Sequence, residues 1–456
     1  MTPTSGLVLA HAFGKRYELP IPLLAFVLGG AAVVLVSFLL VRPRRLRPEG
    51  ERSADVPDFR RLSPVGAAVS VGGLVLGILA GVAGSQQVAE NILPTLFWLI
   101  AWIAVPLSCG LVGDWTQPIN PFANLARLAD RPGLREALLG GPEVLPWPDW
   151  LGWWPAVVLF FLTACGELIF NLTLTVPATT AVALMAYAIL SATSGLVFGR
   201  SWVERGELFT VLYSTWGRLG FFRFGARGRR GFAGGLEPGF SEHPSRIAFV
   251  LLLLISVNFD GLLATPGWIR LEHVFPGSLV LHPQRLEAFR TISLLVLGMT
   301  IALVFGAFAA AATKVGRRAA GFRASLAGLL PSLLPIAFGY LFAHNIEYLL
   351  VNAQLLAPLV GNPLGTSSWA LHLPYPFNDT FEPSHTFLPS AFYWYFSVVV
   401  IVTAHVGAVV LAHRHLQTVS ADERHARRAE YPWLVAMIGY TMLSLWLLAQ
   451  PLATGG

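Results

Sequence analysis

Charged residues are scarce in this chain. Asp, Glu, Lys and Arg make up 12% of its 456 residues, whereas a soluble domain carries about a quarter. Hydrophobic residues make up 55%, and the mean hydropathy is +0.62. The shortage of charge excludes an ordinary soluble domain and favours a membrane protein with the lipid bilayer as its main partner.

Lysine and cysteine are nearly absent. Lys15 and Lys314 are the two lysines, so 29 of the 31 basic residues are arginines. The net charge is +6, but these arginines lie in short loops between apolar runs, which is typical of membrane orientation rather than of nucleic-acid binding. We therefore expect no nucleic-acid partner. Cys109 and Cys165 both lie in apolar runs and form neither a disulfide framework nor a metal-binding pattern.

Several sequence motifs are missing. The chain has no G-x-x-x-x-G-K-[ST], which excludes a P-loop ATP-driven pump, and no H-E-x-x-H, which excludes a metalloprotease of that type. It has no G-x-S-x-G nucleophile elbow and no C-x-x-C-H haem attachment site. The function must therefore depend on residues that lie outside these short motifs.

Long apolar segments are what the chain does have. Most are near the length that crosses a bilayer as a helix, and helices satisfy their own backbone hydrogen bonds in lipid. The sequence predicts an all-α fold, with residues 1–456 forming one transmembrane helix bundle of about ten spans. The predicted spans are 19–41, 64–84, 93–111, 155–176, 179–198, 247–263, 291–312, 326–350, 390–412 and 432–448.

The arginines predict the orientation of these spans. If the loop after the first span is cytoplasmic, the inner segments hold 26 basic residues and the outer segments hold five. Positive charge concentrates on the cytoplasmic side of membrane proteins. The distribution predicts that the N- and C-termini both lie outside.

Two loops carry more than connecting chain. Residues 199–246 predict a cytoplasmic loop that begins with an amphipathic helix at the membrane interface, because Trp202, Leu208, Leu212 and Trp216 follow helical spacing. Residues 361–389 predict an extracytoplasmic loop long enough to act as a lid.

The stretch from 325 to 360 concentrates polar groups within an apolar segment. As one straight helix it would be about 54 Å long, well beyond a hydrocarbon core of about 30 Å. Pro331 and Pro335 predict a bend. Polar side chains at membrane depth usually face a cavity. Counting along the spans predicts an outward-facing pocket formed by Glu167, Asn171, Asn258, Asp260, His344, Asn345 and Glu347.

Metal binding is one interpretation of this cluster. His344 and Glu347 are one turn apart and can share a metal or relay a proton. With His405, which lies toward the inner leaflet, they are the candidate ligands for a divalent transition metal such as zinc or copper. The alternative is structural: Glu167 as a protonated acid between helices, Asp260 as a helix cap, and both histidines as buried bundle residues. If the chain were cleaved after Ala10, His11 would become a candidate copper ligand through its amine and ring.

Several segments resemble a known family. HAFGKRYELPIPLLAFVLGGAAVVLVSF, GDWTQPINPF, GRSWVERGELF, VNFDGLLATPGW, LLPIAFGYLFAHN and TAHVGAVVLAHRH occur in order along nearly the whole chain. They are similar to stretches of bacterial polytopic membrane proteins often labelled fenitrothion hydrolase. The resemblance implies a bacterial cytoplasmic membrane protein, phosphotriester hydrolysis and a second membrane subunit. It supplies no catalytic residues to transfer.

Three functions are compatible with these observations. The first is a membrane protein that binds or transports a small solute or metal ion through the outward pocket. The second is a metal-dependent phosphotriester hydrolase, in which a bound metal would lower the pKa of a water to about 7. The third is a scaffold subunit of a membrane complex. The same residues serve the first two, so the sequence leaves the choice open.

Overall fold

The computed structural model describes residues 22–40, 63–224, 231–236, 240–274, 279–317, 321–369, 371–384, 386, 388–420 and 422–449. Within these residues the fold is helical and contains no β-strand, which confirms the all-α prediction. His11 and part of the predicted lid lie outside the described residues.

Eight helical segments of the described chain are long and apolar enough to cross a membrane. Two shorter apolar helices, α1 (Leu23–Leu40) and α7 (Trp154–Leu168), accompany them. The long segments are α2 (Pro64–Ala83), a composite Ile92–Val112, α9 (Pro177–Phe198), α11 (Pro244–Leu263), α13 (Pro283–Val315), a composite Phe322–Gly361, α16 (Ser390–Val419) and α17 (Glu423–Ala449).

Prolines and short polar caps set the starts of many of these helices. Proline stands in the first two positions of α2, α7, α9, α11 and α13, where its missing N–H costs nothing and its fixed φ suits a helix. At α2, the Ser63 hydroxyl also accepts a hydrogen bond from the Gly66 amide at 3.2 Å.

The composite helix Ile92–Val112 contains an unusual turn. It consists of α3 (Ile92–Pro94), a ten-residue π-helix η1 (Thr95–Ala104) and α4 (Val105–Val112). π-Helical turns are rare and are frequent at functional sites. Here the π-helix carries Trp102 and Ile103, which both line the pocket described below.

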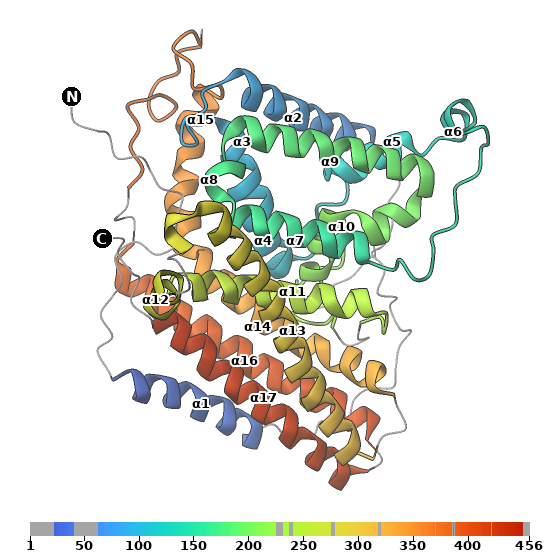
Figure 1. Cartoon of the computed structure of the whole chain (residues 1–456), viewed down its shortest axis with the longest axis vertical. Coiled ribbons are helices and arrows are strands. Elements are labelled where there is room, and N and C mark those ends of the chain that lie inside the picture. The colour runs from blue at the N-terminus through green and yellow to red at the C-terminus, as the bar shows by residue number, and fades with distance from the viewer. Residues whose placement is uncertain are drawn as a thin grey trace.

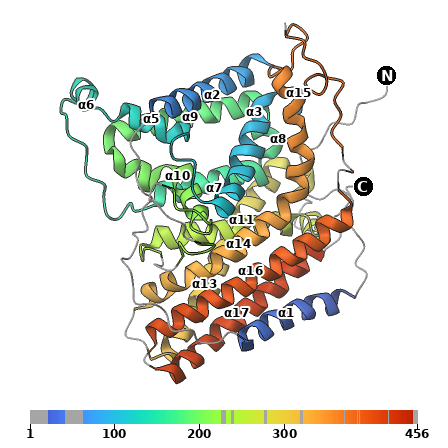
Figure 2. The same cartoon turned by 180° about the vertical axis from the view of Figure 1, so that it is seen from behind.

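The second composite begins with α14 (Phe322–Asn352), which continues through Pro331 and Pro335. A 3₁₀ turn, η4 (Ala353–Leu355), and α15 (Leu356–Gly361) follow. Figure 2 shows that this chain, in orange, changes direction on its way to α15. A bend at Pro331 and Pro335 themselves stays a prediction.

Helices α11 and α14 lie at the centre of the molecule. Most residues of their membrane windows are buried, whereas fewer than a third of those of α2, α9 and α13 are buried. The exposed side chains on α2, α9 and α13 are largely apolar, as expected for surfaces in contact with lipid. α14 packs most extensively on α16, and α17 packs against α1, α13 and α16 (Figures 1 and 2).

Short helices complete the fold at both sides of the bundle. Figure 1 shows α8, α12 and α15 on the left and α5 and α6 on the right. Their bounds are α5 (Pro121–Ala129), α6 (Pro132–Leu139), α8 (Asn171–Leu174), η2 (Trp202–Gly206), α10 (Leu208–Gly217), α12 (Pro266–Val274) and η3 (Leu279–Leu281).

The predicted interfacial helix differs from the structure. α10 is buried along nearly its whole length and packs against α4 and α7, rather than lying on the membrane surface. Its face opposite Leu212 and Trp216 carries the small residues Thr210, Ser214 and Gly217. The Thr210 and Ser214 hydroxyls donate to Glu207 and to the Val211 carbonyl, so this face can be buried as well. α10 is therefore part of the core.

Candidate functional site

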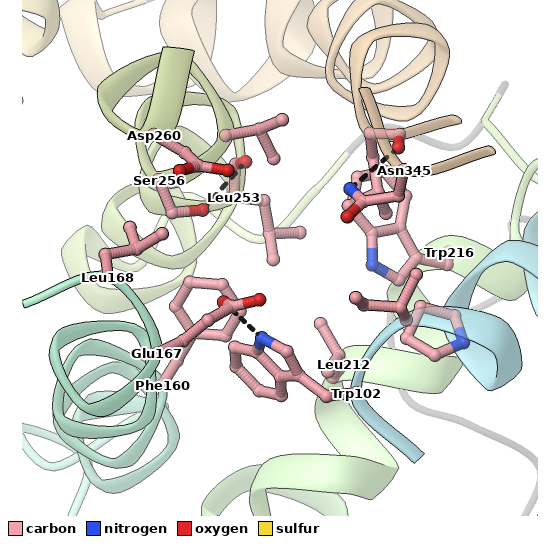
Figure 3. A pocket seen from close by; sticks show the side chains of 14 residues that line it. Trp102, Phe160, Glu167, Leu168, Leu212, Trp216, Leu253, Ser256, Asp260 and Asn345 are labelled. Atoms are coloured by element: carbon pink, nitrogen blue, oxygen red, sulfur yellow. Dashed lines mark hydrogen bonds between the residues drawn. The ribbon is translucent and has the colours of Figure 1, made fainter. Parts of the chain in front are cut away.

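A pocket lies where the central helices meet the composite Ile92–Val112 and α10. The space in this pocket that water can occupy is about 50 Å³. This is enough for a few water molecules, at about 10–15 Å³ each. Figure 3 shows polar side chains reaching into it from several helices. The described lining residues are Trp102, Ile103, Pro106, Phe160, Glu167, Leu168, Leu212, Trp216, Leu253, Ser256, Val257, Asp260, Leu341 and Asn345.

Glu167 supplies the first carboxylate. It is the penultimate residue of α7, and its Oε2 accepts a hydrogen bond from the indole Nε1 of Trp102 at 2.5 Å. The dashed line in Figure 3 marks this contact. Because Trp102 belongs to the π-helix, this hydrogen bond connects two separate spans at the wall of the pocket.

Asp260 supplies the second carboxylate. It lies near the end of α11, and its Oδ2 is 2.5 Å from Nε2 of His344 on α14. The Asp260 side chain is 28% exposed and faces the pocket, while the His344 side chain is 6% exposed and stands behind it. The pair therefore connects the two central helices.

Neutral oxygen atoms accompany the acids. Ser256 lies one turn before Asp260 on α11, so both side chains reach the same face of that helix. Asn345 lines the opposite wall, and its Nδ2 donates to the Leu341 carbonyl at 3.0 Å, which leaves its Oδ1 to face other groups. Neither Lys nor Arg is among the 14 lining residues.

Three predicted pocket residues line this pocket: Glu167, Asp260 and Asn345. The other four do not line it. His344 is reached through Asp260, and Glu347 is half-buried outside the lining. The prediction paired His344 with Glu347 because they are neighbours on one helix, but the structure pairs His344 with an acid from another helix.

Asn171 and Asn258 also differ from the prediction. The predicted span 155–176 breaks after Leu168, so Asn171 starts the separate helix α8 and its Oδ1 accepts from the Leu172 amide. Asn258 lies on α11 but donates to the Tyr440 hydroxyl on α17, away from the pocket. Because α7 ends at Leu168, Glu167 lies at the end of its helix and not within a longer span.

The three predicted metal ligands do not form one site. His405 is buried on α16, where its Nδ1 lies 2.8 Å from the Ile401 carbonyl and its ring is 6.2 Å from that of Tyr440. Among the described residues, no group of three or more His, Cys, Asp or Glu side chains is close enough together to hold a metal ion. Any cation in the pocket would need neutral oxygens as well as carboxylates.

Sequence reasoning missed two polar groups of the pocket. Ser256 could have been found from its i−4 spacing to Asp260, which predicts a shared helix face. Trp102 carries a polar N–H that needs a partner when buried. No periodicity in the sequence predicts that its partner is Glu167, 65 residues away.

The pocket lies toward one side of the bundle. Glu167 and Asp260 are both close to the C-terminal ends of their helices, which lead directly into α8 and α12. α8, α12 and α15 lie on the same side of the molecule (Figure 1). The start of α1 and the end of α17 are on that side as well.

The chemistry of this arrangement suits a small cation. Two carboxylates supply negative charge, Ser256 and Asn345 supply neutral oxygens, and no basic side chain competes for them in the lining. Carboxylate and carbonyl oxygens are preferred ligands of Mg²⁺, Ca²⁺ and Mn²⁺.

Comparison with known proteins identifies no relative. No family model matches the chain, and no curated protein and no solved structure matches it.

Proposed function

We propose that this protein is a bacterial cytoplasmic-membrane protein that binds a small divalent cation in the pocket and moves it across the membrane. In this proposal the eight long helices together with α1 and α7 make ten spans. Alternation through ten spans, with the arginine-rich loops inside, puts the start of α1 and the end of α17 outside. The pocket then opens toward the outer side, on which residues 361–369 also lie.

One observation carries the proposal: Glu167 and Asp260, from two different helices, line the same small pocket without a basic neighbour in its lining. Acids at membrane depth are expensive and usually mark an ion path. Two carboxylates balance the charge of one divalent cation. The polar groups of the lining are mainly carboxylate, hydroxyl and amide oxygens, which favour Mn²⁺ or Ca²⁺ over the zinc or copper suggested by the sequence.

The size of the pocket supports a small ligand. A drug-sized ligand needs about 300–1,000 Å³, whereas the space open to water here is about 50 Å³. A cation with one or two waters fits this space.

The test is equilibrium binding of Mn²⁺ to the purified full-length protein in detergent, followed by Mn²⁺ uptake into proteoliposomes. We expect Glu167→Gln and Asp260→Asn each to weaken binding at least about tenfold, a loss of about 1.4 kcal/mol, because each removes one negative charge from the pocket. Asp379→Asn is the control, since Asp379 is exposed in the segment after α15. Equal Mn²⁺ binding by the wild type, the two pocket variants and the control would overturn the proposal.

Phosphotriester hydrolysis, which the family resemblance implies, is the second candidate function. The Asp260–His344 contact favours it, because a carboxylate that orients an imidazole is the arrangement of a general base. The same purified protein decides between the two. Phosphotriester turnover that His344→Asn abolishes, without Mn²⁺ uptake into proteoliposomes by the wild type, would select the hydrolase.

A further inference from the structure

A second set of buried polar groups lies away from the pocket, between α11, α14, α16 and α17. Its centre is Tyr440 on α17, whose hydroxyl accepts a hydrogen bond from Nδ2 of Asn258 on α11. The ring of His405 on α16 lies 6.2 Å from the Tyr440 ring. The three residues are almost completely buried. A hydrogen bond and a ring contact thus join three helices at this point.

Three polar atoms around Tyr440 have no hydrogen-bond partner within the part of the chain that the structure describes. They are Nε2 of His405, Oδ1 of Asn258 and Oγ of Ser444, which lies one turn after Tyr440. Buried polar atoms are nearly always paired, with protein or with ordered water. Unpaired polar atoms from three helices therefore gather around one tyrosine.

The contacts of His405 leave one of its ring nitrogens available to accept a proton. Its Nδ1 lies 2.8 Å from the Ile401 carbonyl, which can only accept, so Nδ1 carries a hydrogen in the neutral ring. The second nitrogen, Nε2, then has a free lone pair in a side chain that is 1% exposed. Histidine can serve as a proton shuttle because one ring nitrogen can accept a proton while the other releases one.

A second titratable pair lies further along the same two helices. Nδ1 of His413 on α16 is 2.9 Å from Oε1 of Glu430 on α17, without the alignment of a hydrogen bond, and both residues are buried. Nε2 of His413 is 2.9 Å from Nε2 of Gln417. His413 is two turns beyond His405, about 12 Å along α16. This pair lies near the inner end of the α16–α17 seam in the proposed orientation.

The surroundings of His405 contain few competing charges. α16 packs against α1, α14 and α17. α1 has no titratable side chain in its described range, α17 contributes Tyr440, and α14 contributes Tyr340. Tyr340 is close enough to Tyr440 to interact with it electrostatically, and its hydroxyl borders Gly261, next to Asp260. The cluster thus approaches the pocket at its outer end and the His413–Glu430 pair at its inner end.

From this placement we propose that the α16–α17 seam is a proton pathway through Tyr440, His405 and the His413–Glu430 pair, and that the protein exchanges protons for its divalent cation. The proposal rests on the cation transport proposed above. Chains of Asp, Glu and His within membrane helices are typical of proton relays in transporters. The cation and the proton then follow separate routes that meet at α11.

The test uses the full-length protein in liposomes that contain a pH-sensitive dye. Addition of Mn²⁺ outside is expected to raise the internal pH as Mn²⁺ enters and protons leave. His405→Leu and Tyr440→Phe are each expected to slow this change at least about tenfold, the low side of the effects seen when a proton-transfer group is removed. Equilibrium Mn²⁺ binding in detergent should remain unchanged in both, because neither residue lines the pocket.

His273→Leu is the matched control. Nδ1 of His273 makes the same contact as His405, 2.7 Å from the carbonyl four residues earlier, but His273 is exposed on α12. It should leave the proton movement intact. Tyr440→Phe keeps the ring and its packing, so it provides a test even if His405→Leu does not fold.

The outcomes separate the two proposals. If wild-type protein binds and transports Mn²⁺ without proton movement, or if both variants move protons at the wild-type rate, the proton pathway is overturned and cation transport stands. If the wild type binds no Mn²⁺, cation transport fails. Proton entry driven by a potassium-diffusion potential then decides the pathway: a rate that depends on His405 and Tyr440 supports it, and an equal rate in the variants overturns it.

Discussion

At the residue scale, the structure satisfies one buried acid completely and leaves two others facing a cavity. Glu207 is fully buried and caps the start of α10. Its Oε2 accepts from Nδ2 of Asn120 and from the Thr210 amide, each at 2.7 Å, and its Oε1 accepts from the Tyr187 hydroxyl at 2.6 Å. Glu167 and Asp260 instead line the pocket. This contrast separates a structural acid from candidate ligands.

The role of Glu207 leads to a stability prediction. In the wild type both carboxylate oxygens of Glu207 accept hydrogen bonds. Glu207→Gln replaces one of these oxygens with an N–H₂ group, which cannot accept, and each buried donor left unpaired costs about 1–3 kcal/mol. We expect the variant to lose at least about 2 kcal/mol of stability, measured as a lowered midpoint of thermal unfolding in detergent. Glu204→Gln is the control, because Glu204 pairs with the exposed Arg200 and such surface pairs contribute about 0–1 kcal/mol. Similar midpoints for both variants would contradict the capping role.

At the scale of elements, small residues decide how closely helices approach. α5 packs against α9 where Gly195 faces Ala126. A Cβ on Gly195 would lie 2.4 Å from the Ala126 Cα, which is closer than real contacts allow. Small residues allow this kind of close backbone approach between membrane helices.

Gly195→Ala is therefore expected to destabilise the protein by about 1–3 kcal/mol, because one helix must move to admit the methyl group. Gly73→Ala is the matched control, since a Cβ on Gly73 in α2 meets nothing within 4 Å. It should leave the unfolding midpoint unchanged or slightly raised, because Ala is the better helix former. Thermal unfolding of both variants in one detergent makes the comparison. A Gly195→Ala protein as stable as the control would show that α5 and α9 are less closely packed.

At the scale of the whole molecule, the orientation of the bundle decides whether the pocket opens outward. The proposed topology puts Ser368, in the segment after α15, outside and Ala137, on α6, inside. Both side chains are exposed, whereas Cys109 and Cys165 are buried thiols. Single cysteines at the two exposed positions can therefore report the two sides of the membrane.

Labelling of intact cells with a membrane-impermeant maleimide tests this topology. Ser368→Cys is expected to react in intact cells, and Ala137→Cys only after the membrane is permeabilised. The protein with its two native cysteines alone is the control and should remain unlabelled in both conditions. Labelling of both positions from outside would overturn the ten-span arrangement, and the reverse pattern would invert the proposed direction of transport.

The sequence by itself determined the fold class. Its apolar segments specify helices because lipid offers the backbone no hydrogen bonds, and each of the ten predicted segments falls largely within a helical element. The acids Glu167 and Asp260 could be chosen from the sequence because charge within an apolar span is costly.

Only the tertiary structure decided which polar groups meet. Hydropathy reports that a residue is buried but not which helix it faces, so the sequence paired His344 with its neighbour Glu347 instead of with Asp260, 84 residues away. Local spacing likewise suggested that α10 lies on the membrane surface, while the packing of α4 and α7 around it encloses it in the core. Contacts between spans depend on how the helices rotate and cross, and a pattern within one helix contains no information about that geometry.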